Sequence, residues 1–205
     1  MRKNVLVQSL SFLLWMTILT GVLYPAFVTL AAGLAFRDKA GGSLIRLGGE
    51  VRGSRLLAQD FGGGPWFLAR PSATDWATLP SGASNLAATN PGLAKERAAN
   101  VAAWAAASGF GKSQAPASPI PPDMAASSAS GLDPDISLEA ALGQLDRVAT
   151  ARGLDAAAKS ALETRIRAMA AASETLLGPA RVNVVELNAS LEAAAPPAAS
   201  PGAGK

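Results

Sequence analysis

The sequence predicts an α+β protein made of one N-terminal transmembrane helix and a single domain in which helices cover a small sheet. Two observations lead to this prediction. No charged residue occurs between Lys3 and Arg37, and the rest of the chain alternates short strand-like segments with segments of helical apolar periodicity. We therefore expect an anchor over residues 1–36, a soluble domain over residues 37–192 and a disordered tail over residues 193–205.

The predicted membrane span covers residues 10–34, which are mostly Leu, Val, Ile, Phe, Trp, Met and Ala. About 20 helical residues cross a hydrocarbon core of ~30 Å, so this segment is long enough. The alternative is a cleaved signal peptide that begins with Arg2 and Lys3, but the apolar region of a signal peptide runs only ~7–15 residues. Basic residues flank both ends of the helix, so their count leaves its orientation open.

One face of this helix is predicted to pack against other protein. Thr17, Thr20, Gly21 and Tyr24 recur at the spacing of one helical face. Small or weakly polar residues on such a face let a second membrane helix approach closely. The alternative is that these residues are tolerated singly, as in any spanning helix. At Pro25 we expect a kink or a junction with a second apolar stretch.

The composition excludes several classes of function. The chain has no histidine and no cysteine, so a Ser-His-Asp triad and a zinc site built from Cys or His are impossible. Without Arg2 and Lys3, 16 basic residues stand against 15 acidic ones, and the basic ones are not clustered. A nucleic-acid partner therefore has little electrostatic support. We expect no catalytic residue, no metal site and no cofactor bound by this chain alone.

The soluble part is predicted to alternate strands and helices. Strands are expected over residues 51–59, 66–69 and 181–187, the second of which is stopped by Pro71. Residues 109–122 are rich in Ser, Pro and Gly and are expected to form an exposed connection. Helices are expected over residues 92–107, after an N-cap at Ser137, after an N-cap at Asp155 and after a cap at Asn188.

Three polar groups are candidates for binding. Arg70 is expected where a strand ends, in position for an anion or a partner carboxylate, with a structural ion pair as the alternative. Asp133 and Asp135 could hold a hard cation, or they could complement the dipole of the following helix. Gln144 and Arg147 share one helix face, which either meets a partner or ligand or is solvated.

Seven groups of residues form a pattern in chain order: residues 20–25, 53–61, 70–74, 81–91, 129–137, 144–152 and 182–188. They include Thr-Gly-Val-Leu-Tyr-Pro, Arg-Pro-Ser-Ala-Thr, Ser-Gly-Leu-Asp-Pro and Val-Asn-Val-Val-Glu-Leu-Asn. Each group alone is weakly specific. Together the sequence resembles the C-subunit family of the Kdp-type, P-type potassium-transporting ATPases of bacteria.

The resemblance implies a non-catalytic accessory subunit of a high-affinity, ATP-driven potassium uptake pump. Such a subunit acts in assembly or stabilisation, or as a catalytic chaperone of the ATP-hydrolysing subunit. Its partners would be a channel-like subunit that carries potassium and a P-type subunit that hydrolyses ATP. Contact with ATP would then occur only within the complex. The chain would cross the bacterial inner membrane once, with its soluble domain outside the cytoplasm.

The candidate partner-binding residues lie in the membrane helix and in the motifs of the soluble domain. They are Thr17, Thr20, Gly21, Tyr24, Arg70, Ser84, Asn85, Asn90, Asp133, Gln144 and Arg147. The alternative function is a free-standing, membrane-anchored extracytoplasmic domain that binds a small ligand at Arg70 and Asp133.

Overall fold

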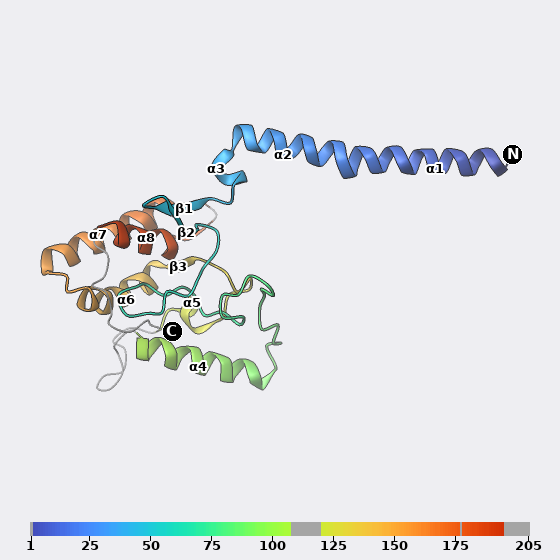
Figure 1. The fold of residues 1–205 in the computed structure, drawn as a ribbon. Helices are drawn as coiled ribbons and strands as arrows, with labels where there is room; N and C mark the ends of the chain where they lie inside the picture. The colour runs from blue at the N-terminus through green and yellow to red at the C-terminus, as the bar shows by residue number, and fades with distance from the viewer. Residues whose placement is uncertain (1, 108–119, 177, 195–205) are drawn as a thin grey trace, which may run out of the picture. The chain divides into compact units, whose positions relative to one another are not determined.

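The computed structural model describes residues 2–107, 120–176 and 178–194 of the chain (Figure 1). The chain folds as two compact units, Met1–Leu44 and Ile45–Lys205, which are described separately below. Most of the expected connection over residues 109–122 and residues 195–205 of the expected tail lie outside the described residues.

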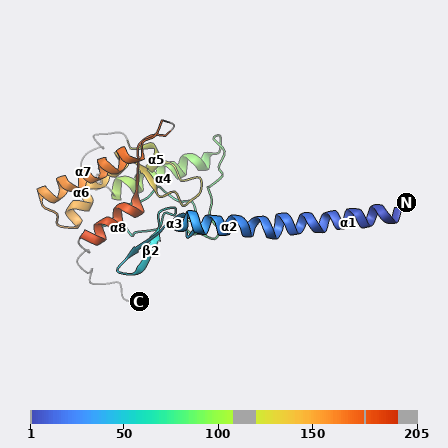
Figure 2. The same ribbon diagram turned by 90° about the horizontal axis from the view of Figure 1, so that it is seen from above.

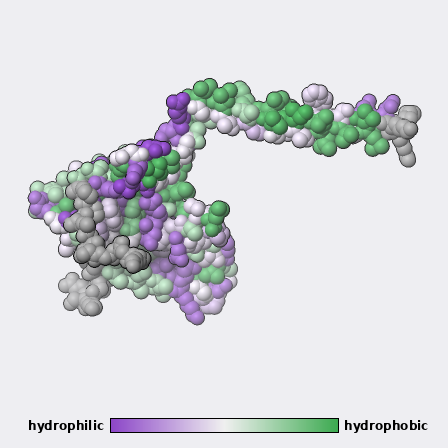
Figure 3. All heavy atoms as spheres, viewed as in Figure 1, coloured by the Kyte–Doolittle hydropathy of each residue, from purple (hydrophilic) through white to green (hydrophobic). Residues whose placement is uncertain are grey.

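The first unit is dominated by a long apolar helix. It consists of α1 (Arg2–Ile18), a π-helical turn η1 (Leu19–Leu23) and α2 (Tyr24–Ala35), and a short helix α3 (Arg37–Ala40) follows. Residues Asn4–Ala35 are long and apolar enough to cross a membrane, with a mean hydropathy of 1.8. Hydrophobic side chains cover most of this rod in Figure 3, and none of the span is buried within the chain. This matches the expected transmembrane anchor.

The π-helical turn η1 lies directly before Pro25. A proline in a helix lacks the N–H donor, and its ring clashes with the carbonyl group four residues earlier, here that of Gly21. The widened turn η1 lies at this position, with the Tyr24 N–H donating to the carbonyl of Leu19, five residues before it. Figure 2 shows α1 and α2 continuing along one line, so the expected kink takes the form of an extra residue in one turn.

This extra residue changes the face that was expected to meet another helix. One inserted residue rotates the following helix by about 100° relative to a continuous α-helix. Thr17 and Tyr24 are therefore about a third of a turn apart, and the expected single stripe of Thr17, Thr20, Gly21 and Tyr24 is wrong. The hydroxyl of Thr20 donates to the carbonyl of Met16 at 2.7 Å, so its hydrogen bond is satisfied within its own helix.

The second unit contains two separate two-stranded sheets and five helices among its described residues. Strands β1 (Leu44–Leu47) and β2 (Glu50–Ser54) form a hairpin around Gly48 and Gly49, both of which have positive φ. Strands β3 (Asp135–Ser137) and β4 (Arg181–Asn183) pair antiparallel, with Ile136 opposite Val182. The helices are α4 (Pro91–Ala107), α5 (Pro122–Ala125), α6 (Leu138–Ala151), α7 (Ala156–Ser173) and α8 (Val184–Ala194). The expected α+β class is confirmed.

Two expected helix starts are confirmed by hydrogen bonds. The hydroxyl of Ser137 accepts from the Ala140 N–H at 3.1 Å and begins α6. The carboxylate of Asp155 accepts from the Ala158 N–H at 2.7 Å and begins α7. Helix α4 begins with Pro91, close to the expected range of 92–107.

The expected strands are shorter than the sequence pattern suggested. Residues 66–69 form no strand, and the strand expected over 51–59 is only β2. The segment 181–187 splits into β4 and the first turn of α8, where the Asn183 side chain accepts from the Glu186 N–H at 3.0 Å. Asn188 is therefore inside α8 and does not cap it, because the cap position belongs to Asn183.

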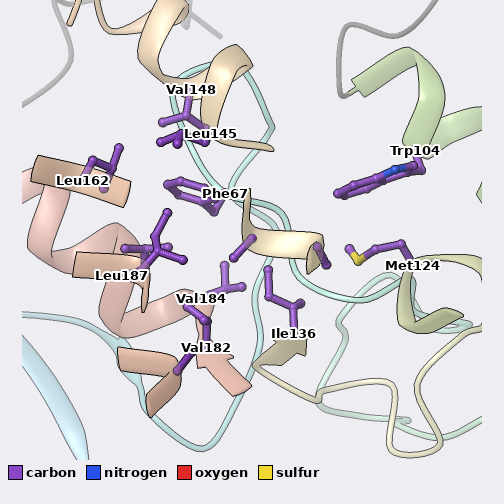
Figure 4. Packing of buried hydrophobic residues seen from close by; sticks show 14 residues of the cluster. Phe67, Trp104, Met124, Ile136, Leu145, Val148, Leu162, Val182, Val184 and Leu187 are labelled. Carbon is purple, nitrogen blue, oxygen red and sulfur yellow. The ribbon is translucent and has the colours of Figure 1, made fainter. Parts of the chain in front are cut away.

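The hydrophobic core of the second unit lies where β3, β4 and helices α6, α7 and α8 meet. Phe67 is fully buried at the centre of this cluster, among Leu145, Val148 and Leu187 (Figure 4). Trp104 of α4 and Met124 of α5 extend the cluster to one side. The fold thus buries a residue from a segment that has no secondary structure of its own.

Two side-chain amides form hydrogen bonds with the backbone of this irregular segment. In a sheet, a neighbouring strand would supply these bonds. Asn188 accepts from the Phe67 N–H at 2.9 Å and donates to the Phe67 carbonyl at 2.8 Å. Gln144 accepts from the Leu68 N–H at 2.7 Å and donates to the Leu68 carbonyl at 3.1 Å. Asn188 and Gln144 are 1% and 0% exposed. We call these four hydrogen bonds the amide clamp, since together they satisfy the backbone of two consecutive residues next to the core.

We expect Gln144→Ala to destabilise the domain by about 2–4 kcal/mol, because it leaves the polar groups of Leu68 without partners in a largely buried place. Unfolding of the full chain in detergent by urea, followed by near-ultraviolet circular dichroism, measures this. Asp146→Ala is the matched control on the same helix, since the Asp146 side chain is 81% exposed in an ion pair with Lys159. Equal losses for the two variants would contradict the role of the amide clamp.

Candidate functional site

Two loops that are far apart in sequence pack together beside the amide clamp. The first covers residues 70–84 and the second covers residues 128–135; we call them together the loop cluster. The Ser128 N–H donates to the Pro71 carbonyl at 2.9 Å, and the Ala58 N–H donates to the Leu132 carbonyl at 2.8 Å. Because the clamp bonds Leu68 and Ser128 bonds Pro71, Arg70 is held from both sides.

Arg70 and Asp133 form the ion pair that joins the two loops. The Arg70 Nη1 atom lies 2.9 Å from the Asp133 Oδ2 atom, and the two side chains are 25% and 33% exposed. The Nε atom of Arg70 is buried and makes no hydrogen bond within the described residues. The pair is thus partly open to solvent.

Serine hydroxyl groups hold the backbone of both loops. Ser72 Oγ accepts from the N–H groups of Thr74 and Trp76, at 3.2 and 3.0 Å. Ser128 Oγ accepts from the Gly131 N–H at 3.0 Å, and Ser130 Oγ accepts from the Leu132 N–H at 3.1 Å. These bonds replace the ladder bonds that strands would supply, so the loops keep defined shapes without regular structure.

Gly131 is the point of closest approach between the loops. Its φ of +71° lies in the left-handed region. A Cβ atom at this position would lie 2.8 Å from both the Gly82 carbonyl oxygen and the Thr74 Oγ1 atom. Only glycine therefore fits, and the Ser-Gly motif of the first loop rests directly on the Ser-Gly motif of the second.

The carboxylates of Asp133 and Asp135 serve internal contacts. Asp133 Oδ1 accepts from the Asp135 N–H at 3.1 Å, and Asp135 Oδ1 accepts from the Asn183 side-chain amide at 3.0 Å. Ser137 is the residue that begins the following helix. Among the described residues, no three carboxylate, histidine or cysteine side chains gather at one place in a way that could hold a metal ion.

Gln144 and Arg147 share one face of α6, as expected, but this face points inward. The Arg147 Nη2 atom donates to Gln144 Oε1 at 2.8 Å, and its Nη1 atom donates to the Gly64 carbonyl. Burial of the guanidinium lowers the pKa of Arg147. The expected solvated face is wrong for Gln144, because its side chain is 0% exposed and its amide is hydrogen-bonded to Leu68 and Arg147.

The remaining candidates occupy several places. Asn90 accepts from the Gly92 N–H at 2.8 Å at the start of α4, so its side chain acts as a helix cap. Asn85 is exposed with a φ of +54°, and Ser84 is half-buried near it. The four membrane-helix candidates belong to the other unit. The structure therefore brings together two pairs of the expected set, Arg70 with Asp133 and Gln144 with Arg147, and contact of any candidate with a partner stays a prediction.

Asn188 is the residue that sequence reasoning missed. Its position four residues after Val184 and three before Leu191 places an amide on the apolar face of α8, where a polar side chain needs a buried partner. That signal was hidden because residues 184–187 were interpreted as strand. Ser72 and Gly131 were visible only as motif letters and Ser128 lay outside the motifs, because the bonds of all three depend on how the two loops meet.

We expect Gly131→Ala to destabilise the domain by about 2–4 kcal/mol, from backbone strain at positive φ and from the clash with the Gly82 carbonyl. Gly153→Ala is the matched control, since Gly153 has a φ of +65° but nothing within 4 Å of an added Cβ atom. Thermal unfolding of the full chain measures both. We expect the larger loss of thermal stability at Gly131, and the difference between the two variants is the cost of the close approach between the loops. An equal loss of stability would show that the loops separate easily.

The comparison with known proteins covers most of the chain. A family model described as "K+-transporting ATPase, c chain" matches residues 6–193. A relative from Pseudomonas entomophila (strain L48), named a potassium-transporting ATPase KdpC subunit, is 44% identical over 93% of this chain and 96% of its own length. A relative of the same name from Rhodopseudomonas palustris (strain TIE-1) is 41% identical over 90% of this chain and 94% of its own length. The chain therefore belongs to the KdpC family of potassium-transporting ATPase subunits.

Proposed function

We propose that this chain is a non-catalytic accessory subunit of an ATP-driven potassium uptake pump, and that it helps to assemble or stabilise the ATP-hydrolysing machinery. Its partners are a potassium-carrying, channel-like subunit and a P-type subunit that hydrolyses ATP. The chain binds no cofactor in its own right. The alternative of a free-standing ligand-binding domain is less favoured, because it does not explain a membrane helix with polar groups on it.

The loop cluster is the single observation that carries this proposal. Its serine hydroxyl groups bond the backbone of the two loops, and the Arg70–Asp133 pair joins the loops while its side chains stay 25% and 33% exposed. An enzyme site needs a nucleophile with a base, a metal cluster or a cofactor loop. A rigid loop surface with one partly exposed ion pair instead favours recognition of a complementary protein surface.

Nucleotide contact through Gln144 is not supported by its surroundings. Its amide oxygen accepts from Leu68 and Arg147, and its amide nitrogen donates to Leu68. A nucleotide would have to break the amide clamp to reach this side chain. Help with ATP hydrolysis therefore acts through the partner subunit rather than through this residue.

An experiment that reverses the ion pair separates a structural role from a partner contact. We expect Arg70→Asp and Asp133→Arg, each alone, to lower both the melting temperature and the amount of pump that co-purifies with this chain. The double variant restores an internal ion pair, so its melting temperature recovers. Its co-purification stays reduced by about tenfold, the effect of 1.4 kcal/mol of binding free energy, because a partner now meets reversed charges.

Lys95→Glu on α4 is the control for a charge change outside the loop cluster, since Lys95 is exposed. Co-purification of this variant should match that of the unaltered chain. Full recovery of the pump with the double variant would mean that the ion pair is purely structural and would remove Arg70 from the partner surface.

Because the chain has no cysteine, single introduced cysteines can report its orientation in the membrane. We expect Ala129→Cys, an exposed position in the loop cluster, to react with a membrane-impermeant maleimide in intact cells, because we place the domain outside the cytoplasm. Asn4→Cys, on the opposite side of the span, should react only after the cells are permeabilised. The reverse pattern would place the domain beside the ATP-hydrolysing site and contradict the proposed topology.

A further inference from the structure

The hairpin β1–β2 and the turn after it expose large apolar side chains beside basic ones. Val51, Leu56 and Leu57 are 49%, 59% and 40% exposed. Together with Arg46 we call them the hairpin surface. Hydrophobic and hydrophilic residues lie next to one another over this hairpin in Figure 3. Single exposed apolar residues are ordinary, but three within seven positions of the chain form a feature that needs a cause.

Only one face of the hairpin is covered by the described part of its own domain. A two-residue turn at Gly48 and Gly49 places Arg46 opposite Val51, so both point to the same side of the two-stranded sheet. Ile45 and Arg52 point to the other side, where they line a cavity with residues of α8. The Arg52 guanidinium lies 3.1 Å from Glu192 of that helix. Arg46 and Val51 therefore lie on the outward face of the hairpin, and Leu56 and Leu57 are exposed in the turn that follows it.

The exposed leucines are held outward by hydrogen bonds. The Leu56 N–H donates to Ser54 Oγ at 3.1 Å, and the Leu57 N–H donates to the Ser54 carbonyl at 3.3 Å. The next residue is buried, and its N–H bonds the Leu132 carbonyl. A fixed turn thus presents Leu56 and Leu57 at the surface, where burying each against an apolar environment would be favourable.

The charge of this region indicates what that environment is. Residues 37–57 carry five basic and two acidic side chains, in a chain whose formal net charge is +3. Arg52 and Arg55 pair with Glu192 and Glu186 of α8, at 3.1 and 2.8 Å. The charge of Arg37, Lys39 and Arg46 complements the anionic headgroups of a phospholipid bilayer.

The length of the chain limits how far the hairpin can lie from the end of the span. Strand β1 begins at Leu44, nine positions after Ala35, the last residue of the candidate span. Four of the intervening residues form α3. An extended residue covers at most about 3.5 Å and a helical one about 1.5 Å, so the strand starts within about 25 Å of the end of the span.

We propose that the hairpin surface rests on the headgroup layer of the bilayer that holds the membrane helix. Val51, Leu56 and Leu57 enter the boundary between headgroups and acyl chains, and Arg46 lies against lipid phosphates. The combination of apolar and basic side chains is the one by which protein segments bind anionic membrane surfaces. This inference concerns contact with lipid and does not depend on the accessory role proposed above.

The test uses single cysteines in the full, naturally cysteine-free chain, labelled with a fluorophore and reconstituted in vesicles. The vesicles contain phosphatidylcholine alone or mixed with phosphatidylglycerol, and their acyl chains carry bromine as a quencher. We expect Val51→Cys and Leu56→Cys to be quenched at least about twofold more than Lys95→Cys, an exposed position on α4, and more strongly with phosphatidylglycerol. Adding Lys39→Gln and Arg46→Gln should abolish that preference.

Each other outcome overturns the proposal. Quenching at Val51→Cys and Leu56→Cys no greater than at Lys95→Cys would show that the hairpin surface stays in water. Quenching that disappears when the other pump subunits are reconstituted with the chain would assign the surface to a protein partner. Val22→Cys, inside the span, is the positive control for insertion and is quenched in every preparation used.

Discussion

The amide clamp is the interaction on which the rest of the domain depends. Phe67 is the fully buried centre of the core, yet it belongs to a segment without helix or strand. Its backbone and that of Leu68 are bonded by two side chains, from Asn188 of α8 and Gln144 of α6. Backbone N–H and carbonyl groups left without hydrogen bonds there would cost more folding free energy than burial of the aromatic ring contributes. The ring can therefore be buried only if these groups are hydrogen-bonded at the same time.

Further contacts from α6 strengthen this arrangement. Arg147 bonds both Gln144 and the Gly64 carbonyl, and the Arg152 guanidinium lies 4.8 Å from the centre of the Trp66 ring. Because residues 64–68 are held by these contacts, Arg70 lies at a defined position. The Ser128 N–H bonds the chain again at the Pro71 carbonyl. The loop cluster thus obtains its rigidity from side chains of helices that do not themselves reach the proposed partner surface.

The proposed contacts with lipid and with protein use surfaces of different chemistry. The membrane helix has a π-helical turn before Pro25 that rotates Tyr24 away from Thr17, so it presents two narrower faces where one was expected. In the domain, the Arg70–Asp133 pair and the hairpin surface differ in chemistry: the first is polar and shaped by loops, the second apolar and basic. We infer that they suit different neighbours, a protein subunit for the first and the bilayer for the second.

Features that depend on local physical chemistry could be predicted from the sequence. An uncharged apolar run predicted the membrane helix, and Ser137, Asp155 and Pro91 marked helix starts, because caps act within one turn of the chain. Long-range packing sets the rest: the backbone at residues 67 and 68 bonds side chains in place of a strand, Gln144 points inward, and Gly131 meets Gly82. These contacts join residues 49–121 positions apart, and no local pattern records which distant group will satisfy a buried N–H.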